Sequence, residues 1–439
     1  MVKVVVVGGG WSGCGAAIAA AKAGAQVTLL ERTDMLLGTG LVGGIMRNNG
    51  RYTATEEMIA LGGGDLFKIC DTHSRHRNIE FPGHKHVNLY DIADTYGAVL
   101  EHLKSLNIEV VFESRIIQVS MDGKKILSVK DQLDRVFKGD VFVDTTGTAG
   151  PMGNCIKYGN GCAMCILRCP SFGGRVSLTN LAGVEEMIGK KVDGSIGAMS
   201  GACKFFKESL SQEIQNELNS KGVAIIPLPQ ELIEDHLGTK ACQQYALPEF
   251  KDNVILLDTG HAKLMAPFFS LERLRKIPGF EHARYEDPYA GGKGNSMRYF
   301  GMAPRDNHLK VDGVDNLFCG GEKAGLLVGH TEAIITGFLA GHNSVRLAAD
   351  NPLLQLPREL AVGDAIAFVK EKMATEEGMG KKFTFSGSIY FERMKELGLY
   401  RLDAEKIQAE VTALGLKDIF NQPLVKNKKL EVADNALCS

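Results

Sequence analysis

The chain has 439 residues, of which 44% are hydrophobic and 23% are charged, as in an ordinary globular protein. Its 50 Lys and Arg residues nearly balance 52 Asp and Glu residues, and this argues against a strongly basic nucleic-acid binder and an acidic disordered chain. No apolar run approaches the ~18 residues of a membrane span, and the first residues do not read as a signal peptide. We therefore expect a cytoplasmic protein with reduced cysteines.

The first 31 residues predict a βαβ unit. A β-branched strand over Val2–Val7 is followed by a helix of small residues over Ala16–Ala23 and by a second strand over Val27–Leu30. The turn before the helix has the GxGxxG pattern of Gly8, Gly10 and Gly13. In this context the pattern is typical of a dinucleotide site, with the diphosphate at the helix N-terminus.

The residues of this turn have distinct expected roles. Gly8 permits the tight turn, Gly10 lets the backbone approach the diphosphate, and Gly13 packs the helix against the strand. We place the cofactor beside these glycines and their neighbours Trp11 and Ser12. Glu31, at the end of the second strand, is expected to accept a hydrogen bond from a ribose hydroxyl, with Arg32 beside it.

The next hundred residues predict a glycine-rich loop followed by mixed helices and strands. The loop over Gly38–Gly44 includes Gly38 and Gly40, which we add to the cofactor-binding residues. Helical pattern appears over Glu56–Cys70, and Asn88 is predicted to cap a helix over Leu89–Leu106. Strands are expected over Glu109–Phe112, Arg115–Val119, Ile126–Val129 and Val136–Asp144.

The second half of the chain is mixed α and β and then helical. A helix over Ser209–Leu218 and a strand over Val254–Asp258 follow a loop rich in Cys, Gly and Pro. A strand over Val314–Cys319 then leads into Gly320 and Gly321, and a helix over Thr331–Ala349 follows it. After Pro352, helices are predicted over Arg358–Met373 and Asp403–Leu414.

Two segments resemble the two-dinucleotide-binding-domain flavoproteins. Val143–Gly147 resembles their strand that ends in Ala-Thr-Gly, and Asn316–Glu322 resembles their C-terminal strand that ends in Gly-Asp or Gly-Glu. The resemblance implies FAD, with the acid at Glu322 on the ribityl chain and a helix N-terminus near the flavin. It implies further cofactor contacts at Thr146, Gly147, Gly321 and Thr331.

The chain also resembles the GidA and TrmFO flavoproteins, the second of which are folate-dependent tRNA methyltransferases. The similarity to TrmFO lies in Ile277–Ala283 and in Gly320–Ala348, above all Gly337–Asn343, and GidA shares the second of these stretches. Residues 52–150 also resemble the flavin subunit of heterodisulfide reductase. The methyltransferases' catalytic Cys has no counterpart in Met46–Asn49, and the flanks of Cys203 do not match their second one, so methyl transfer is not carried over.

These observations predict an α/β protein with a Rossmann-like, glutathione-reductase-like FAD-binding domain. We expect its first part over residues 1–154 and its return segment over 310–349. An inserted α+β substrate or interaction domain, with the Cys-rich loop, is expected over 155–309. A small helical C-terminal region is expected over 350–439.

Four cysteines lie close together in the sequence, at Cys155, Cys162, Cys165 and Cys169. The last three have the C-x2-C-x3-C-P spacing of ferredoxins, and four thiolates suit a [4Fe–4S] cluster. Bound zinc, a redox dithiol and incidental cysteines remain as alternatives. We expect a metal-binding, iron–sulfur redox centre that exchanges electrons with FAD.

The histidine- and arginine-rich segment 73–86 is a solvated polar loop or a cationic rim for an anionic substrate or partner, with metal binding by its histidines as a further alternative. For acid–base chemistry at the flavin the best-placed candidates are His330 and Glu332, with Lys323 as a cation that stabilises reduced flavin. His330 as a helix cap and Lys323 as a surface residue are the alternatives.

The predicted function is an FAD-dependent oxidoreductase that relays electrons through the cysteine-ligated centre. The alternatives are a folate-dependent tRNA or rRNA uridine-modifying flavoprotein and a flavin electron-transfer subunit of a redox complex. Expected partners are a redox protein or a small molecule, in a homo-oligomer without membrane contact. RNA is less favoured because the net charge is close to zero.

Overall fold

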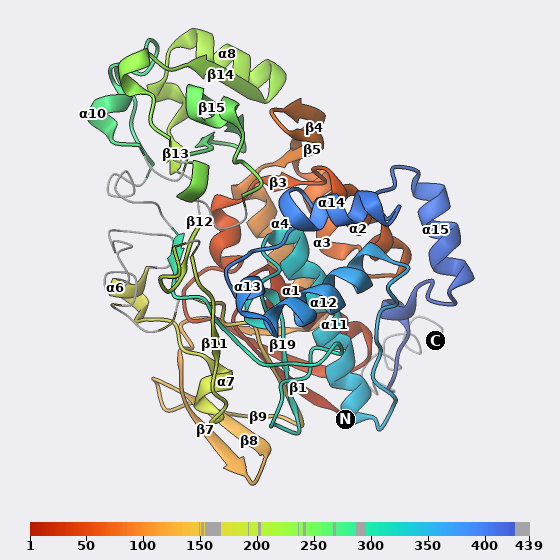
Figure 1. Ribbon diagram of the computed structural model, residues 1–439. Coiled ribbons are helices and arrows are strands. Elements are labelled where there is room, and N and C mark those ends of the chain that lie inside the picture. The colour runs from red at the N-terminus through yellow and green to blue at the C-terminus, as the bar shows by residue number, and fades with distance from the viewer. Residues whose placement is uncertain are drawn as a thin grey trace, which may run out of the picture.

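The computed structural model describes residues 1–148, 150, 153, 168–191, 193–200, 203–235, 237–239, 243–266, 269–286 and 296–425. Figure 1 shows one body in which the first and the last third of the chain intermingle. No helix in these ranges is long and apolar enough to span a bilayer.

A five-stranded sheet with parallel pairing organises this body, in the order β19-β10-β1-β2-β6. Its strands are β1 (Lys3–Val7), β2 (Gln26–Leu30), β6 (Glu109–Val111), β10 (Val141–Asp144) and β19 (Leu317–Cys319). Residues 4–7 of β1 and 141–143 of β10 are buried on both faces, as these apolar runs predict. The predicted α/β class with a Rossmann-like sheet is confirmed.

Two helices with small residues cross closely beside this sheet. α1 (Trp11–Lys22) packs on α11 (His330–Ala348), and glycines on α11 permit the contact. A Cβ on Gly337 would lie 2.2 Å from the Ser12 carbonyl oxygen, and one on Gly341 would lie 2.1 Å from that of Ala16. The return of the chain at β19 and α11 therefore completes the sheet and covers α1.

Antiparallel strands flank the parallel sheet at two places. One group is β3 (Ile45–Met46), β4 (Ser74–Phe81) and β5 (His84–Tyr90), and the other is β7 (Ile116–Asp122), β8 (Lys125–Asp131) and β9 (Val136–Lys138). Two predictions are corrected here. Asp91, not Asn88, caps α4 (Ile92–Ser105), because residues 84–90 pair with β4, and the expected strand over 136–144 is two strands.

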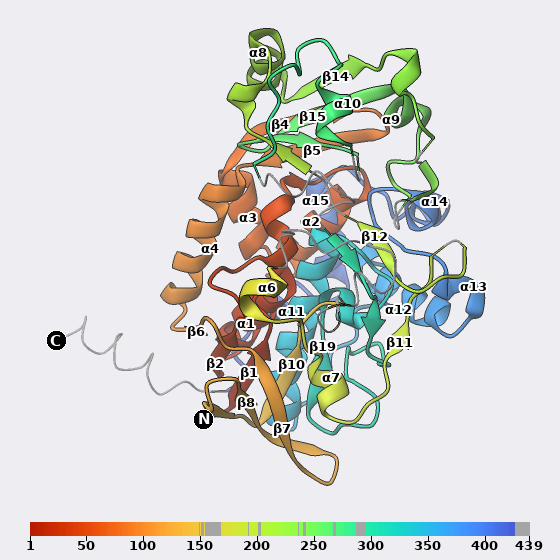
Figure 2. The ribbon, with the colours of Figure 1, turned by 90° about the vertical axis from the view of Figure 1, so that its left-hand side faces the viewer.

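The segment between β10 and β19 carries a separate antiparallel sheet, ordered β13-β16-β15-β14. Its strands are β13 (Cys203–Phe205), β14 (Val223–Pro227), β15 (Asn253–Asp258) and β16 (Ala262–Leu264), with α8 (Gln212–Lys221) packed on them. In Figure 2 this green unit lies next to the β4–β5 hairpin. Two short pairs join β11 (Met187–Ile188) to β18 (Gly301–Met302) and β12 (Ala198–Ser200) to β17 (Ser296–Arg298).

Residues 350–425 wrap back onto the N-terminal part of the chain. They form α12 (Ala361–Met373), α13 (Glu376–Met379), α14 (Ser388–Glu396) and α15 (Ala404–Ala413). The buried carboxylate of Glu57 on α2 (Gly50–Ala60) accepts the backbone N–H groups of Ala361 and Val362, at 2.9 Å each, and so caps α12. The C-terminal helices are thereby tied to the body around the sheet.

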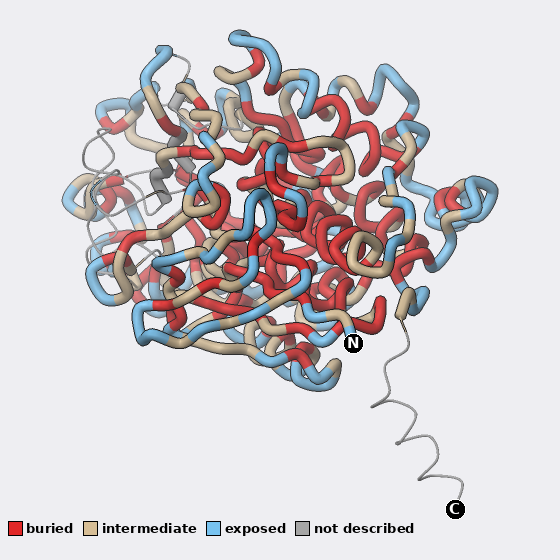
Figure 3. The backbone as a smooth tube through the Cα atoms, turned by 90° about the horizontal axis from the view of Figure 1, so that it is seen from below, coloured by how far each residue is buried: buried red, intermediate tan, exposed pale blue. Residues whose placement is uncertain are grey.

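The largest core surrounds the parallel sheet, α1 and α11, and Figure 3 shows it as a continuous buried interior. A second core lies within the antiparallel sheet of the inserted segment.

Further short helices in the described residues are α3 (Asp65–Thr72), α6 (Cys169–Phe172), α7 (Leu178–Leu181), α9 (Pro248–Asp252) and α10 (Leu271–Leu274).

Candidate functional site

A cavity of about 230 Å³ lies at the carboxyl ends of β1, β2 and β10. Its walls come from the turn between β1 and α1, the loop over residues 37–45, the inserted segment and the N-terminus of α11. In open α/β sheets ligands bind at this edge of the strands. The cavity is therefore the candidate cofactor and substrate site.

The glycine turn has the geometry that a diphosphate needs. Gly8 has a φ of 105°, and a Cβ there would lie 2.4 Å from the Thr145 carbonyl oxygen. A Cβ on Gly13 would lie 1.8 Å from the Gly8 carbonyl oxygen. α1 begins at Trp11 without a side-chain cap, so its first N–H groups face the cavity.

The side chain of Ser12 adds an open hydrogen-bonding group at the same point. Its hydroxyl is buried and has no hydrogen-bond partner within the described part of the chain, and Ser12 lines the cavity. Buried polar atoms normally have partners. A phosphate oxygen at the N-terminus of α1 would supply one, so the residues present fit a dinucleotide.

Glu31 and Arg32 lie at one end of the cavity. The Glu31 carboxylate accepts the backbone N–H groups of Gly9 and Thr33, at 2.7 Å each, and this fixes the turn beside the phosphate position. Burial and the neighbouring Arg175 lower the pKa of Arg32 to about 10. Crowding of guanidinium groups favours an anionic ligand between them.

The charge of the cavity lining supports an anionic ligand. Six cationic side chains line it, against the two carboxylates of Glu31 and Glu322. The cations are Arg32, Arg51, Arg115, Arg168, Arg175 and Lys263. Arg175 lies beside Gly147, where an added Cβ would lie 2.3 Å from its Nη1.

At the opposite end of the cavity, aromatic and polar groups gather around Gly43. A Cβ on this glycine would lie 2.3 Å from the His330 ring and 2.6 Å from the Tyr90 hydroxyl. The Trp11 ring lies 6.1 Å from that of Tyr90 and 6.4 Å from that of His330, measured between centroids. Of the three predicted catalytic residues, His330 lines the cavity.

Glu332 does not line the cavity, because its carboxylate is fully buried in a network. It accepts hydrogen bonds from Arg51 at 3.1 Å, from Thr384 at 2.6 Å and from the Phe385 backbone at 3.0 Å. Arg51 does line the cavity. The structure therefore gives Glu332 the position of a residue that orients Arg51.

Lys323 is also turned away from the cavity. Its ammonium donates to the Glu186 carboxylate at 2.5 Å and to the Gly301 carbonyl at 3.1 Å, and the side chain is 2% exposed. Thr331 is likewise buried, and its hydroxyl donates a hydrogen bond to the Met46 sulfur at 3.5 Å. Neither residue lines the cavity.

The other predicted cofactor residues divide into two groups. Gly13 and Gly40 pack inside the structure, Gly40 against the Trp11 ring. The rest line the cavity: Gly8, Gly10, Trp11, Ser12, Glu31, Arg32, Gly38, Thr146, Gly147, Gly321 and Glu322. The Glu322 carboxylate also accepts a hydrogen bond from Thr148 at 3.0 Å.

Three of the four clustered cysteines, Cys155, Cys162 and Cys165, lie outside the described residues. Cys169 is buried at the start of α6, within electrostatic reach of Arg32. The described ranges contain no group of three or more His, Cys, Asp or Glu side chains that could hold a metal ion.

Cys14, on α1 beside the glycine turn, is not an acidified thiol, because burial and Glu31 raise its pKa to about 12.

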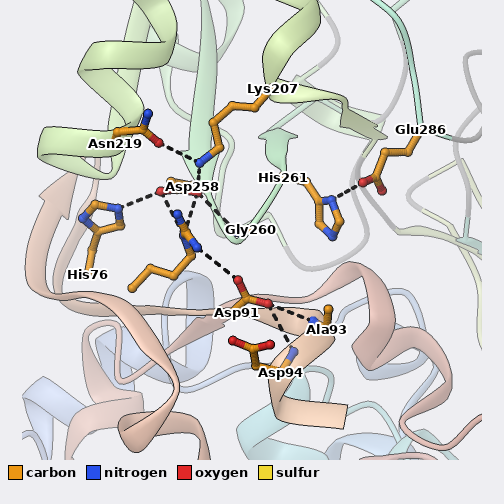
Figure 4. A network of polar contacts seen from close by, with 11 residues as sticks. His76, Asp91, Ala93, Asp94, Lys207, Asn219, Asp258, Gly260, His261 and Glu286 are labelled. Carbon is orange, nitrogen blue, oxygen red and sulfur yellow. Dashed lines mark hydrogen bonds and ion pairs between the residues drawn. The ribbon is translucent and has the colours of Figure 1, made fainter. Parts of the chain in front are cut away.

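The histidine- and arginine-rich segment forms the β4–β5 hairpin rather than a solvated loop. The carboxylate of Asp258, at the end of β15, binds Arg75 at 3.1 Å, His76 at 2.9 Å and Lys207 at 2.6 Å (Figure 4). Arg75 also contacts Asp91 at 3.2 Å. Much of the positive charge expected on a cationic rim is thus neutralised within the protein.

Comparison with known proteins places this geometry in a family. A family model described as glucose inhibited division protein A matches residues 3–254 and 260–352, well over half of the chain. The chain belongs to the GidA family. The resemblance to GidA flavoproteins drawn from the sequence is confirmed.

A curated relative and two solved structures are similar to this GidA-family chain. The "tRNA uridine 5-carboxymethylaminomethyl modification enzyme MnmG" of Karelsulcia muelleri (strain GWSS) is 21% identical over 419 residues, covering 82% of this chain and 66% of that protein. The chain thus spans slightly less than two thirds of this relative's length. Aquifex aeolicus GidA gives a TM-score of 0.68 in one crystal form, at 17% identity over 99% of this chain and 75% of that one. The other form gives 0.62, at 16% identity over 94% and 78%.

Among the cavity residues that were not predicted from the sequence of this GidA-family chain are Arg51, Gln244, Tyr245 and Lys263. Arg51 belongs to α2, and the other three belong to the inserted segment. No motif marks them, because each reaches the cavity through tertiary packing of segments that are distant in the chain. The only sequence signal was the general expectation that the inserted segment contacts substrate.

Proposed function

We propose that this GidA-family chain is an FAD-dependent oxidoreductase that acts on a uridine base in tRNA. The observation that carries the proposal is the cavity, which has a dinucleotide turn at one end and side chains of the inserted segment at the other. FAD would supply hydride transfer. The name of the Karelsulcia relative supplies the substrate class.

The residues of the chain have separable roles in this proposal. The N-terminus of α1 and the Ser12 hydroxyl bind the diphosphate, and Arg175 adds positive charge there. The N-terminus of α11 faces the far end of the cavity, where its dipole favours negative charge on a ring. Glu332 orients Arg51 toward the substrate side.

The aromatic wall of the inserted segment suits a flat base. Tyr245 lines the cavity, and its ring lies 4.8 Å from that of His84 and 6.4 Å from that of Phe81, with which it is stacked. A ring held in this way offers a rigid surface for base stacking, which contributes about 1–3 kcal/mol per base. We therefore assign the substrate base to the space beside Tyr245.

The proposal predicts a yellow purified protein that releases FAD on denaturation and retards tRNA in a native gel. The tRNA affinity should fall as salt rises from roughly 50 to 200 mM, because phosphate contacts release counterions. Tyr245→Ala should weaken tRNA binding roughly tenfold with FAD retained, and Tyr245→Phe should preserve it. FAD-loaded protein that does not bind tRNA would refute the RNA substrate and leave the oxidoreductase.

A cysteine-ligated electron-transfer centre is the second candidate. Cys169 favours it, because this buried thiol follows Arg168, which lines the cavity, and lies within electrostatic reach of Arg32. Iron analysis and electron paramagnetic resonance of anaerobically purified protein test it. About four iron atoms per chain are expected for such a cluster, whereas iron-free protein of full flavin content would exclude it.

A further inference from the structure

Lys263 places a buried ammonium in the cavity wall. It lies in the middle of β16, its side chain is buried, and its Nζ donates to the carbonyls of Val42 and, at 2.5 Å, of Gly43. Both carbonyls belong to the loop that follows Gly38 along the cavity. Lys263 thus joins the inserted segment to the loop that borders the proposed cofactor.

The position of Lys263 follows from the order of groups along the cavity. The acid after β2 marks the adenosine ribose, and the N-terminus of α1 marks the diphosphate. The remaining end contains Gly43, which contacts His330 and whose carbonyl binds Lys263. If FAD occupies the cavity as proposed, its ring system reaches this end.

We propose that Lys263 is a cofactor-contacting residue whose ammonium stabilises negative charge on the flavin ring. The inference rests on the proposed FAD site and goes beyond it, because it assigns this task to the inserted segment. No bond to the lysine forms or breaks; its contribution is electrostatic and strengthened by burial. Lys323, the cation expected from the sequence, is paired with Glu186 outside the cavity lining.

Sulfite titration of the FAD-loaded protein tests the assignment. Sulfite adds to the flavin ring and leaves it negatively charged, so a nearby cation tightens its binding. Lys263→Gln keeps a donor for the loop carbonyls but removes the charge, and we expect roughly tenfold weaker sulfite binding. Lys263→Arg should restore most of the affinity. Lys221→Met, at a residue on α8 whose side chain is 70% exposed, should leave it unchanged.

The outcomes separate the two proposals. A wild-type protein that binds no FAD would refute the proposed function itself. FAD-loaded Lys263→Gln with wild-type sulfite affinity would overturn only the assignment of Lys263. If Lys263→Gln loses FAD, the wild-type and Lys263→Arg proteins are compared with their flavin reduced. The absorbance of reduced flavin shows whether the ring is neutral or anionic. A reduced flavin that is neutral at pH 7 in both would refute the assignment.

Discussion

His342 lies on α11 with its imidazole fully buried, and neither ring nitrogen has a hydrogen-bond partner within the described ranges. Burial and the neighbouring Arg346 lower the pKa of His342 to about 3. The ring packs edge-on against Phe420, with 5.3 Å between centroids. The residue is therefore held as a neutral imidazole in an apolar contact between α11 and the C-terminal segment.

This environment predicts acid sensitivity that one substitution removes. Because the folded state resists protonation of His342 and the unfolded state accepts a proton near pH 6.5, stability should fall as pH decreases from about 6.5 toward 3. His342→Leu should gain about 2 kcal/mol in unfolding free energy over the wild type between pH 7 and pH 5. Denaturant unfolding at both pH values measures it. Parallel pH curves would contradict the buried neutral state.

Individual residues also show where sequence reasoning reached the site and where it did not. Gly8 and Glu31 were predictable because their roles depend on a local strand–turn–helix pattern. Glu332 was expected to act on substrate, yet Arg51 and Thr384 occupy its carboxylate. These partners lie 281 and 52 residues away from Glu332 in the chain, so the sequence around Glu332 does not reveal them.

At the scale of elements, the crossing of α1 and α11 couples the cofactor turn to the C-terminal return of the chain. The helices approach closely because glycines face backbone atoms, with Gly341 against Ala16. α1 begins at the glycine turn, so displacement of this helix moves the N–H groups to which we assign the diphosphate in our proposal. Packing of α1 on α11 therefore helps to hold the glycine turn of the candidate cofactor site in position.

Two glycine-to-alanine substitutions test this coupling. Gly341→Ala would place a Cβ 2.1 Å from the Ala16 carbonyl oxygen and should cost about 1–3 kcal/mol of stability. Gly97→Ala, in the interior of α4 with no atom within 4 Å of the added Cβ, should stabilise by about 0.5–1 kcal/mol. Denaturant unfolding and flavin content are the measurements. Equal stability of both variants would show that the crossing tolerates a methyl group.

Helices and strands were predicted correctly where the sequence signal was local. Prediction failed where a strand depends on pairing with a segment that the local sequence pattern does not reveal. The first βαβ unit and α11 follow from runs of apolar residues and flanking glycines. Residues 84–90 were assigned in part to a helix because Asn88 resembles a cap. Their pairing with β4 makes them a strand, and Asn88 instead donates to Asp71 at 2.9 Å.

At the scale of the whole molecule, the network around Asp258 joins the inserted segment to the β4–β5 hairpin. Its carboxylate is buried and is bound by Arg75 and His76 from β4 and by Lys207 from the inserted segment (Figure 4). The inserted segment contributes Gln244, Tyr245, Lys263 and Met265 to the cavity lining, whereas the hairpin contributes no residue to it. This junction should therefore help to hold the inserted segment in place over the site.

Replacement of Asp258 should loosen the inserted segment. Asp258→Asn leaves the Arg75 and Lys207 cations and the His76 ring around a neutral amide, and breaking a buried ion pair on one side costs about 3–5 kcal/mol. We expect faster hydrogen exchange in β4, β15 and β16 while β1 remains protected. Asp134→Asn, at a carboxylate that is 82% exposed and paired with Lys130, should change stability by less than about 0.5 kcal/mol.

The same variant has a defined pH signature. Lys207, His76 and Arg75 hold the pKa of Asp258 below its ordinary value despite burial. A carboxylate with a depressed pKa contributes stability above the pKa of its unfolded state, near 3.9, and loses it as pH falls through the lower folded value. The stability difference between wild type and Asp258→Asn should therefore be full at pH 6 and shrink below about pH 4. If the difference stayed constant across this range, the ionised carboxylate would not be what joins the two parts.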